Sequence, residues 1–146
     1  MTADTSITDI AHAIQLAVAP VFLLTGIGAV LAVLTNRLGR VIDRGRTLNA
    51  LLLTEVEPDE ADIERQLSVL SRRARLINWA ISLCTACALL ICAVIAVMFL
   101  GSFLPVDMSV PIALLFVTAM TALFAGLVLF LREVYLATAN LRIGAR

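Results

Sequence analysis

The amino-acid sequence predicts an all-α integral membrane protein with three transmembrane helices and a cytoplasmic helical hairpin that extends the first two. Three observations lead to this fold class. The 146-residue chain is 61% hydrophobic, whereas soluble domains are usually about half apolar. Its apolar residues gather in three runs, each long enough to cross the roughly 30 Å hydrocarbon layer of a bilayer. All eleven basic residues are arginines, and they lie only between the first two runs and after the third.

The three spans are expected at about residues 14–34, 77–104 and 110–131. The first contains Pro20, which removes a backbone hydrogen bond and predicts a kink. The second carries Trp79 near its start, a residue type that is typical of the membrane interface. The segment GSFLPVDMSVP separates the last two spans, and Ser109 is placed there to cap the third helix. We therefore expect one membrane domain over residues 1–146, with no internal boundary.

The positions of the arginines predict the orientation of the chain. Residues 1–34 and 76–131 contain no arginine, residues 35–75 contain eight, and the other three follow the last span. Because arginine-rich loops stay in the cytoplasm, the N-terminus should lie outside, and residues 35–75 and the C-terminus should lie inside. The chain has no net charge and no nucleic-acid-binding motif, so nucleic acid is not expected as a partner.

Residues 35–76 are predicted to form the cytoplasmic helical hairpin, with a turn at Pro58. Two apolar stripes at helical spacing face each other across this turn. The first stripe consists of Leu38, Val41, Ile42, Leu48 and Leu52, and the second consists of Ile63, Leu67, Leu70, Ala74 and Ile77. Residues 132–146 should add a short cytoplasmic helix that lies against the hairpin.

Eight arginines flank the cytoplasmic ends of the spans and are called the arginine collar here: Arg37, Arg40, Arg44, Arg46, Arg72, Arg73, Arg75 and Arg132. Two interpretations are open at this point. The collar fixes the topology and contacts anionic lipid headgroups. Alternatively, its guanidinium groups bind an anion at the mouth of a transport pathway.

One face of the first helix carries small, weakly polar residues and is called the small-residue face here: Thr25, Gly28, Ala32, Asn36 and Gly39. At roughly 100° per residue these positions fall within about a third of a turn of one another. Ala29 and Asp43 extend the same face. Such a surface either packs closely against another helix or lines a water-filled pore around a symmetry axis.

Few residues are candidates for chemistry. For Asp43 a structural ion pair is expected, either along its own helix with Arg40 or Arg46, three positions away on either side, or across the hairpin with Arg72, Arg73 or Arg75. The acidic residues between positions 55 and 64 lack the glycine and the alternating ligands of a calcium loop, and are interpreted as a solvated turn. Cys84 and Cys87 lie in an apolar run, where thiols pack rather than react. The sequence contains no catalytic constellation, metal-ligand cluster or cofactor motif, so neither an enzyme nor a cofactor is expected.

The run APVFLLTGIGAVLAVLTNRLGRVIDRGRTL, residues 19–48, resembles the signature of a bacterial membrane family catalogued as domain of unknown function 2721. The likeness covers most of the chain, including the acidic linker and the two later spans. It implies a three-helix protein of the bacterial inner membrane. It brings no activity, substrate or catalytic residue.

Two functions are compatible with these patterns. The spans contain no charged residue, and their polar faces are too modest for a pathway through a single chain, which favours a closed homo-oligomer. The first hypothesis is a homo-oligomeric inner-membrane protein that is channel-like or transport-associated, with the first helix nearest the axis. The alternative is a non-conducting membrane scaffold whose cytoplasmic hairpin docks a protein partner.

Overall fold

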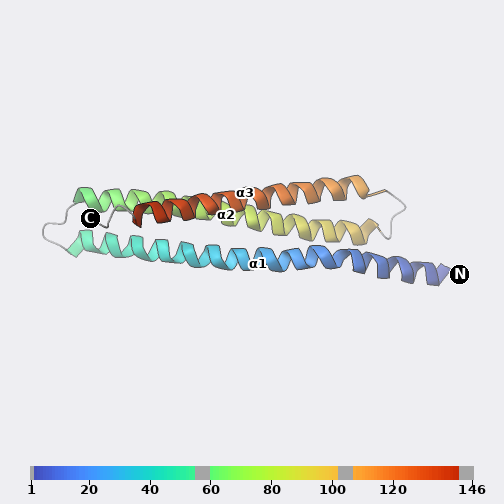
Figure 1. The fold of residues 1–146 in the computed structure, drawn as a ribbon. Helices are drawn as coiled ribbons and strands as arrows, with labels where there is room; N and C mark the ends of the chain where they lie inside the picture. Colours follow the sequence, from blue (N-terminus) through green and yellow to red (C-terminus); the bar gives the residue numbers. More distant parts are fainter. Residues whose placement is uncertain (1, 55–59, 102–106, 142–146) are drawn as a thin grey trace. The chain divides into compact units, whose positions relative to one another are not determined.

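The computed structural model describes residues 2–54, 60–101 and 107–141. These residues form three α-helices in chain order: α1 spans Thr2–Thr54, α2 spans Glu60–Gly101 and α3 spans Ser109–Leu141. Figure 1 shows each of them as one continuous coil. All three are long and apolar enough to cross a membrane. The protein is therefore an all-α membrane protein with three candidate transmembrane helices, as the sequence predicts.

Each helix continues well beyond its apolar run. The α1 helix passes through Pro20 and on through the first arm of the predicted hairpin to Thr54. The α2 helix begins at Glu60, within the predicted hairpin, and ends at Gly101. The hairpin is thus part of the two spanning helices and not a separate element. Its expected turn at Pro58 lies outside the described residues.

The third helix corrects one expectation about the C-terminal segment. A separate short helix was expected to begin at residue 132, but α3 runs without interruption from Ser109 to Leu141. The physical reason is that nothing in the sequence around Leu131 stops a helix, since neither proline nor glycine occurs there. The segment from residue 132 to Leu141 is therefore the C-terminal part of α3.

The helices assemble into two compact units, and each helix contributes to both. Unit 1 contains Met1–Val30 and Leu83–Phe124, and unit 2 contains Leu31–Ser82 and Ala125–Arg146. The arginine collar lies entirely in unit 2. The chemistry of interest is therefore found in one unit, which can be described by itself.

Unit 1 has a small apolar core. Its most deeply buried side chains on α2 are Cys84, Cys87 and Ile91, and Ile27 of α1 and Ala119 of α3 are buried in the same unit. The two cysteines are free thiols, and both occupy core positions in the packing role that was expected. Small residues at these positions let helices approach closely.

The core of unit 2 follows a seven-residue repeat. On α1, Leu34, Val41 and Leu48 are buried at intervals of seven, and Ile77 of α2 is fully buried as well. Such spacing is typical of helices that pack in a left-handed, coiled-coil-like manner. In the predicted apolar stripes, Val41, Leu48 and Ile77 indeed lie in the core. Ile42 differs, because its side chain is exposed.

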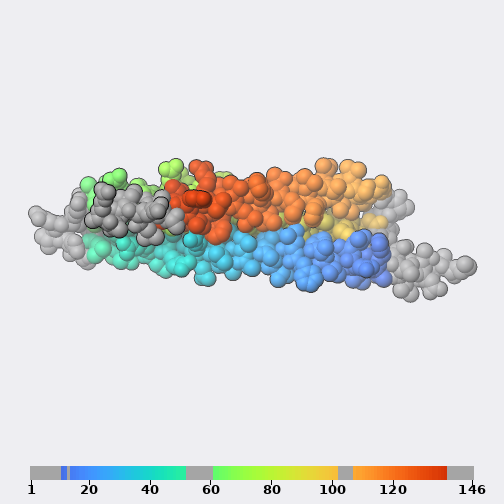
Figure 2. All heavy atoms as spheres, in the orientation of Figure 1, coloured from blue at the N-terminus to red at the C-terminus, as the bar shows by residue number. Residues whose placement is uncertain are grey.

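Most of the apolar surface of the helices is uncovered. Only a small share of each apolar stretch is buried within the chain. The α3 helix, orange to red in Figure 2, contributes to the viewed surface, and it exposes Leu114, Val117 and Phe124. Large exposed apolar side chains of this kind are suited to lipid. The uncovered surface therefore implies contact with the bilayer.

The start of α3 is held by an acidic cap. The backbone N–H of Ser109 donates to Oδ1 of Asp107 at 3.0 Å, so Asp107 supplies the capping oxygen that was expected from Ser109. Hydrogen bonds from the backbone and side chain of Ser109 lower the pKa of the Asp107 carboxyl below its ordinary value. A carboxylate at this position also interacts favourably with the positive end of the helix dipole.

Candidate functional site

A buried carboxylate in unit 2 binds two arginines from two other helices. Glu133 of α3 is the one buried charged residue found among the described side chains, with 1% of its side chain exposed. Nη1 of Arg37, on α1, donates to Oε2 at 2.5 Å. Arg73, on α2, donates to Oε1 through Nη2 at 2.8 Å and through Nε at 3.2 Å. The three residues form a charged layer that links all three helices of this unit.

The packing repeat explains why these side chains meet. On α3 the buried positions are Ala119, Gly126 and Glu133, seven residues apart, so the carboxylate occupies a position that an apolar residue would normally fill. Arg37 lies between the core residues Leu34 and Val41 on α1. The helical register thus aims each of these polar side chains at the interior of the bundle.

An aromatic ring completes the surroundings of one arginine. The guanidinium carbon of Arg37 lies 5.4 Å from the centre of the Phe130 ring, within the range of a cation–π interaction. Phe130 precedes Glu133 by almost one turn on α3, so both groups approach Arg37 from the same helix. Arg37 is therefore held by a charge and by an aromatic face.

The charged layer links the three helices of unit 2 through charge-assisted hydrogen bonds. It contains neither a nucleophile nor a pair of carboxylates that could share a proton. A buried ion pair recovers its desolvation cost only when its hydrogen bonds are well satisfied, and both oxygens of Glu133 are used here. The layer is also unbalanced, because two arginines oppose one carboxylate. About a quarter of each arginine side chain remains exposed, 27% for Arg37 and 25% for Arg73.

Glu133 was missed by the sequence analysis although a signal for it exists. The apolar run ends at Leu131, which predicts the end of the third span there and places Glu133 in a separate helix. If the seven-residue spacing of Ala119 and Gly126 is continued along the same helix, it reaches Glu133. A carboxylate at a core position demands a cationic partner, and the collar supplies two.

The structure divides the arginine collar into two groups. Arg37 and Arg73 are partly buried and contact Glu133. The other six collar members have exposed side chains: Arg40, Arg44, Arg46, Arg72, Arg75 and Arg132. Two of the eight residues assigned to lipid or anion contact therefore also have an internal role.

The small-residue face of α1 is mostly exposed. Thr25, Gly28, Ala32 and Asn36 are exposed, and Gly39 is half-buried. A Cβ atom added at Gly28 or Gly39 would meet no other atom within 4 Å. Among the described residues nothing covers most of this face, because it lies opposite the stripe of core residues that begins at Leu34.

Asp43, for which a structural ion pair was expected, lies on the surface of α1. Its Oδ1 is 4.0 Å from Nη1 of Arg46, and both side chains are more than three-quarters exposed, 76% for Asp43 and 80% for Arg46. An exposed pair at this distance contributes little stability.

Only part of the acidic segment is described. Asp62 and Glu64 are exposed on α2, and Nε2 of Gln66 donates to Oδ2 of Asp62 at 2.8 Å. The acidic residues at 55, 57 and 59 lie outside the described residues. Within the described ranges, no group of three metal-ligating side chains comes together.

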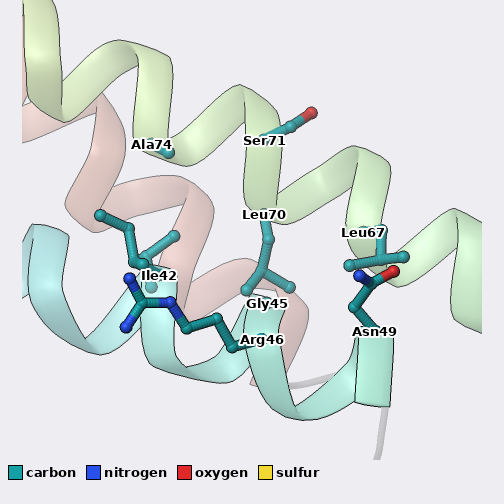
Figure 3. Close-up of a pocket in the computed structure, with 9 residues that line it drawn as sticks. Ile42, Gly45, Arg46, Asn49, Leu67, Leu70, Ser71 and Ala74 are labelled. Atoms are coloured by element: carbon teal, nitrogen blue, oxygen red, sulfur yellow. The ribbon is translucent and has the colours of Figure 1, made fainter. Parts of the chain in front are cut away.

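An open groove of about 350 Å³ lies between α1 and α2 in unit 2. Figure 3 shows Ile42, Gly45, Arg46 and Asn49 on the α1 side of the groove and Leu67, Leu70, Ser71 and Ala74 on the α2 side. The lining is mainly apolar, with Arg46 and Asn49 adding polar groups. The exposed side chain of Ile42 lies in this groove, which explains why it is not in the core.

Comparison with known proteins adds a family but no activity. No curated protein and no solved structure matches the chain. The family model described as "Protein of unknown function (DUF2721)" matches residues 17–143. The matched region includes all three members of the charged layer and the whole small-residue face. The chain belongs to the DUF2721 family, whose function is unknown.

Proposed function

We propose that the protein is a homo-oligomeric protein of the bacterial inner membrane, channel-like or transport-associated, in which the small-residue faces of α1 meet around the symmetry axis. The observation that carries the proposal is the uncovered state of that face in the single chain. Small residues allow backbones to approach closely, and polar groups such as the Asn36 amide bind across helices or face water. Lipid alone offers neither a second helix that could pack closely against this face nor water that could hydrate its polar groups.

The proposed orientation follows from the collar. The N-terminus lies outside, and the charged layer, the exposed arginines and the C-terminus lie in the cytoplasm, because positively charged segments are retained there. The arms of α1 and α2 beyond the bilayer then form a cytoplasmic hairpin. In the oligomer the collar surrounds the cytoplasmic mouth. The proposal assigns no catalytic reaction to the protein.

A subunit count in lipid tests the oligomer. Gly28→Leu places a large side chain on the small-residue face and should reduce the protein to smaller assemblies, measured by native mass spectrometry from nanodiscs. Gly26→Leu is the matched control, since Gly26 is also exposed on α1 with no atom within 4 Å of an added Cβ, but lies off that face. A monomeric wild-type protein, or equal effects of both variants, would refute the proposal.

A second candidate function is a non-conducting scaffold that docks a cytoplasmic protein, and the groove between α1 and α2 favours it. The groove offers apolar side chains at Ile42, Leu67 and Leu70 beside the cation of Arg46. A helix carrying apolar side chains at i, i+3 and i+4 is a common occupant of such a groove.

Site-specific photo-crosslinking in cells tests the scaffold. A photoreactive amino acid at Asn49, which lines the groove, should trap one defined partner, whereas the same group at the exposed Ala61 should not. If both positions give the same products or none, and the purified protein conducts ions in liposomes, the scaffold proposal fails.

A further inference from the structure

The charged layer of unit 2 has one more positive than negative charge. Arg37 and Arg73 share the single carboxylate of Glu133, which leaves a net charge of about one in a largely desolvated place. In the parts of the chain that the structure describes, no second carboxylate pairs with either arginine. Because a quarter of each guanidinium side chain is still exposed, an anion can reach them from outside the bundle.

Two exposed arginines continue the edge of α1 that begins at Arg37. Arg40 and Arg44 follow Arg37 at i+3 and i+7, and at roughly 100° per residue all three lie within about a sixth of a turn. Arg46 lies on the opposite side, toward the groove. Among the described residues, no ion pair involves Arg40 or Arg44. The α1 edge next to Phe130 and Glu133 thus has three aligned guanidinium groups and one carboxylate.

Aromatic residues place this edge near the membrane interface. Trp79 of α2 and Tyr135 of α3 are exposed, and Tyr135 is only two positions from Glu133 on α3. Exposed tryptophan and tyrosine side chains concentrate where hydrocarbon meets the lipid headgroups. The last residue of the apolar run before the edge is Leu34, three positions before Arg37. On the proposed topology, the aligned arginines therefore come within reach of the lipid phosphates.

We propose that Arg37, Arg40 and Arg44 form a binding site for one phosphate group, supplied by an anionic lipid headgroup or by free phosphate. Guanidinium groups bind phosphate oxygens with charge-assisted, often bidentate hydrogen bonds. Arg37 is fixed by Glu133 and Phe130, so it loses little conformational entropy on binding, and Arg40 and Arg44 close over the anion. The bound anion compensates the excess charge of the layer. This inference rests on the proposed membrane topology but not on the oligomer.

The test uses the full-length protein in nanodiscs of phosphatidylcholine with a small fraction of phosphatidylglycerol. The number of phosphatidylglycerol molecules retained by the protein is measured by native mass spectrometry, and the affinity is obtained from their titration. The double variant Arg40→Gln/Arg44→Gln should bind phosphatidylglycerol about thirtyfold more weakly than wild type. Arg72→Gln/Arg75→Gln removes the same charge from α2 and should keep most of the affinity.

Titration with inorganic phosphate distinguishes the two sources of the anion. If phosphate displaces phosphatidylglycerol from wild type but not from the Arg40→Gln/Arg44→Gln protein, free phosphate occupies the site. If phosphatidylglycerol binds and phosphate does not compete, the lipid headgroup is the ligand, and the proposed site stands in either case. If both double variants lose the same affinity for phosphatidylglycerol, the attraction is a general effect of charge and the proposed site is refuted. The proposal is also refuted if neither variant loses affinity. A monomer that still shows the selective loss would refute the oligomer alone.

Discussion

Glu133 shows how one side chain can specify the contacts of three helices. Its two carboxylate oxygens accept three hydrogen bonds from Arg37 and Arg73, which are 96 and 60 positions away along the chain. Buried ion pairs often add little net stability compared with apolar residues of the same size. Their attested use is to fix register, because a shifted helix would leave charges unpaired. We infer this role for the charged layer.

Replacement of Glu133 by leucine should destabilise the protein by about 2–4 kcal/mol, because two partly buried arginines then lose their counter-charge, although their exposed quarter lets water offset part of the loss. The free energy of unfolding can be measured by denaturant titration in detergent. Arg132→Leu is the matched control on the same turn, and it should change stability by less than about 1 kcal/mol because Arg132 is exposed. The triple variant Arg37→Leu/Arg73→Leu/Glu133→Leu should recover most of the loss. Equal stability of Glu133→Leu and wild type would contradict the role of the layer.

At the scale of single helices, each element joins a lipid-facing segment to a polar segment without a break. The α3 helix extends from the cap at Asp107 through its exposed apolar side chains to Glu133 and on to Leu141. The same seven-residue repeat that brings Ala119 into unit 1 brings Glu133 into unit 2. The register of α3 is therefore set by apolar contacts in one unit and by a charged contact in the other.

The cap of α3 predicts a dependence of stability on pH. The pKa of Asp107 is lower in the folded protein than in the unfolded chain, so the folded state gains stability from the ionised carboxylate. This contribution is fully present above the unfolded pKa of about 3.9 and is lost as the pH falls through the lower folded value. Asp107→Ala should therefore lower the melting temperature at pH 7, and the difference from wild type should shrink at acidic pH. If the difference in melting temperature between Asp107→Ala and wild type were the same at pH 7 and at acidic pH, the ionised Asp107 carboxylate would not stabilise the start of α3.

At the scale of the whole molecule, we propose that the exposed surface serves three kinds of contact, with lipid, with water and with a second copy of the chain. The apolar side chains of α3 suit lipid, the outer arginines suit water and headgroups, and the small-residue face of α1 suits another copy of the helix. These assignments lead to two measurements, one on conduction and one on topology.

Conduction should depend on Asn36 if α1 lines the axis. Asn36→Leu places an apolar side chain where water is needed, and apolar constrictions close pores by dewetting. The flux of a permeant ion into liposomes that contain the purified variant should fall severalfold relative to wild type. Val33→Leu, on an exposed part of α1 outside the small-residue face, should leave the flux unchanged. If the wild-type protein gives no more ion flux than empty liposomes do, the proposal of a channel is refuted.

Topology can be measured with single cysteines in a variant whose Cys84, Cys87 and Cys92 are replaced by alanine. Both Glu64 and Asp107 are exposed, so a cysteine at either position is accessible to a reagent on its own side. A membrane-impermeant maleimide should label Asp107→Cys in intact cells and Glu64→Cys only after the membrane is opened. The reverse pattern would invert the proposed orientation.

The sequence by itself determined the helical class, the number of candidate spans and the stripes of core residues, because each depends on the local period and length of apolar segments. Val41, Leu48 and Ile77 lie in the core for this reason. The small-residue face was also predictable, since it lies opposite Val41 and Leu48 on the same helix.

Only the tertiary structure decided which arginines contact Glu133 inside the bundle and which are exposed. Arg37, Arg40 and Arg44 look alike in sequence, and Arg72 and Arg73 are neighbours. Arg37 and Arg73 differ from the others because helix packing brings Glu133 to them from a distant part of the chain. A buried charge must find a counter-charge wherever the fold supplies one, and such pairing leaves no local pattern in a sequence.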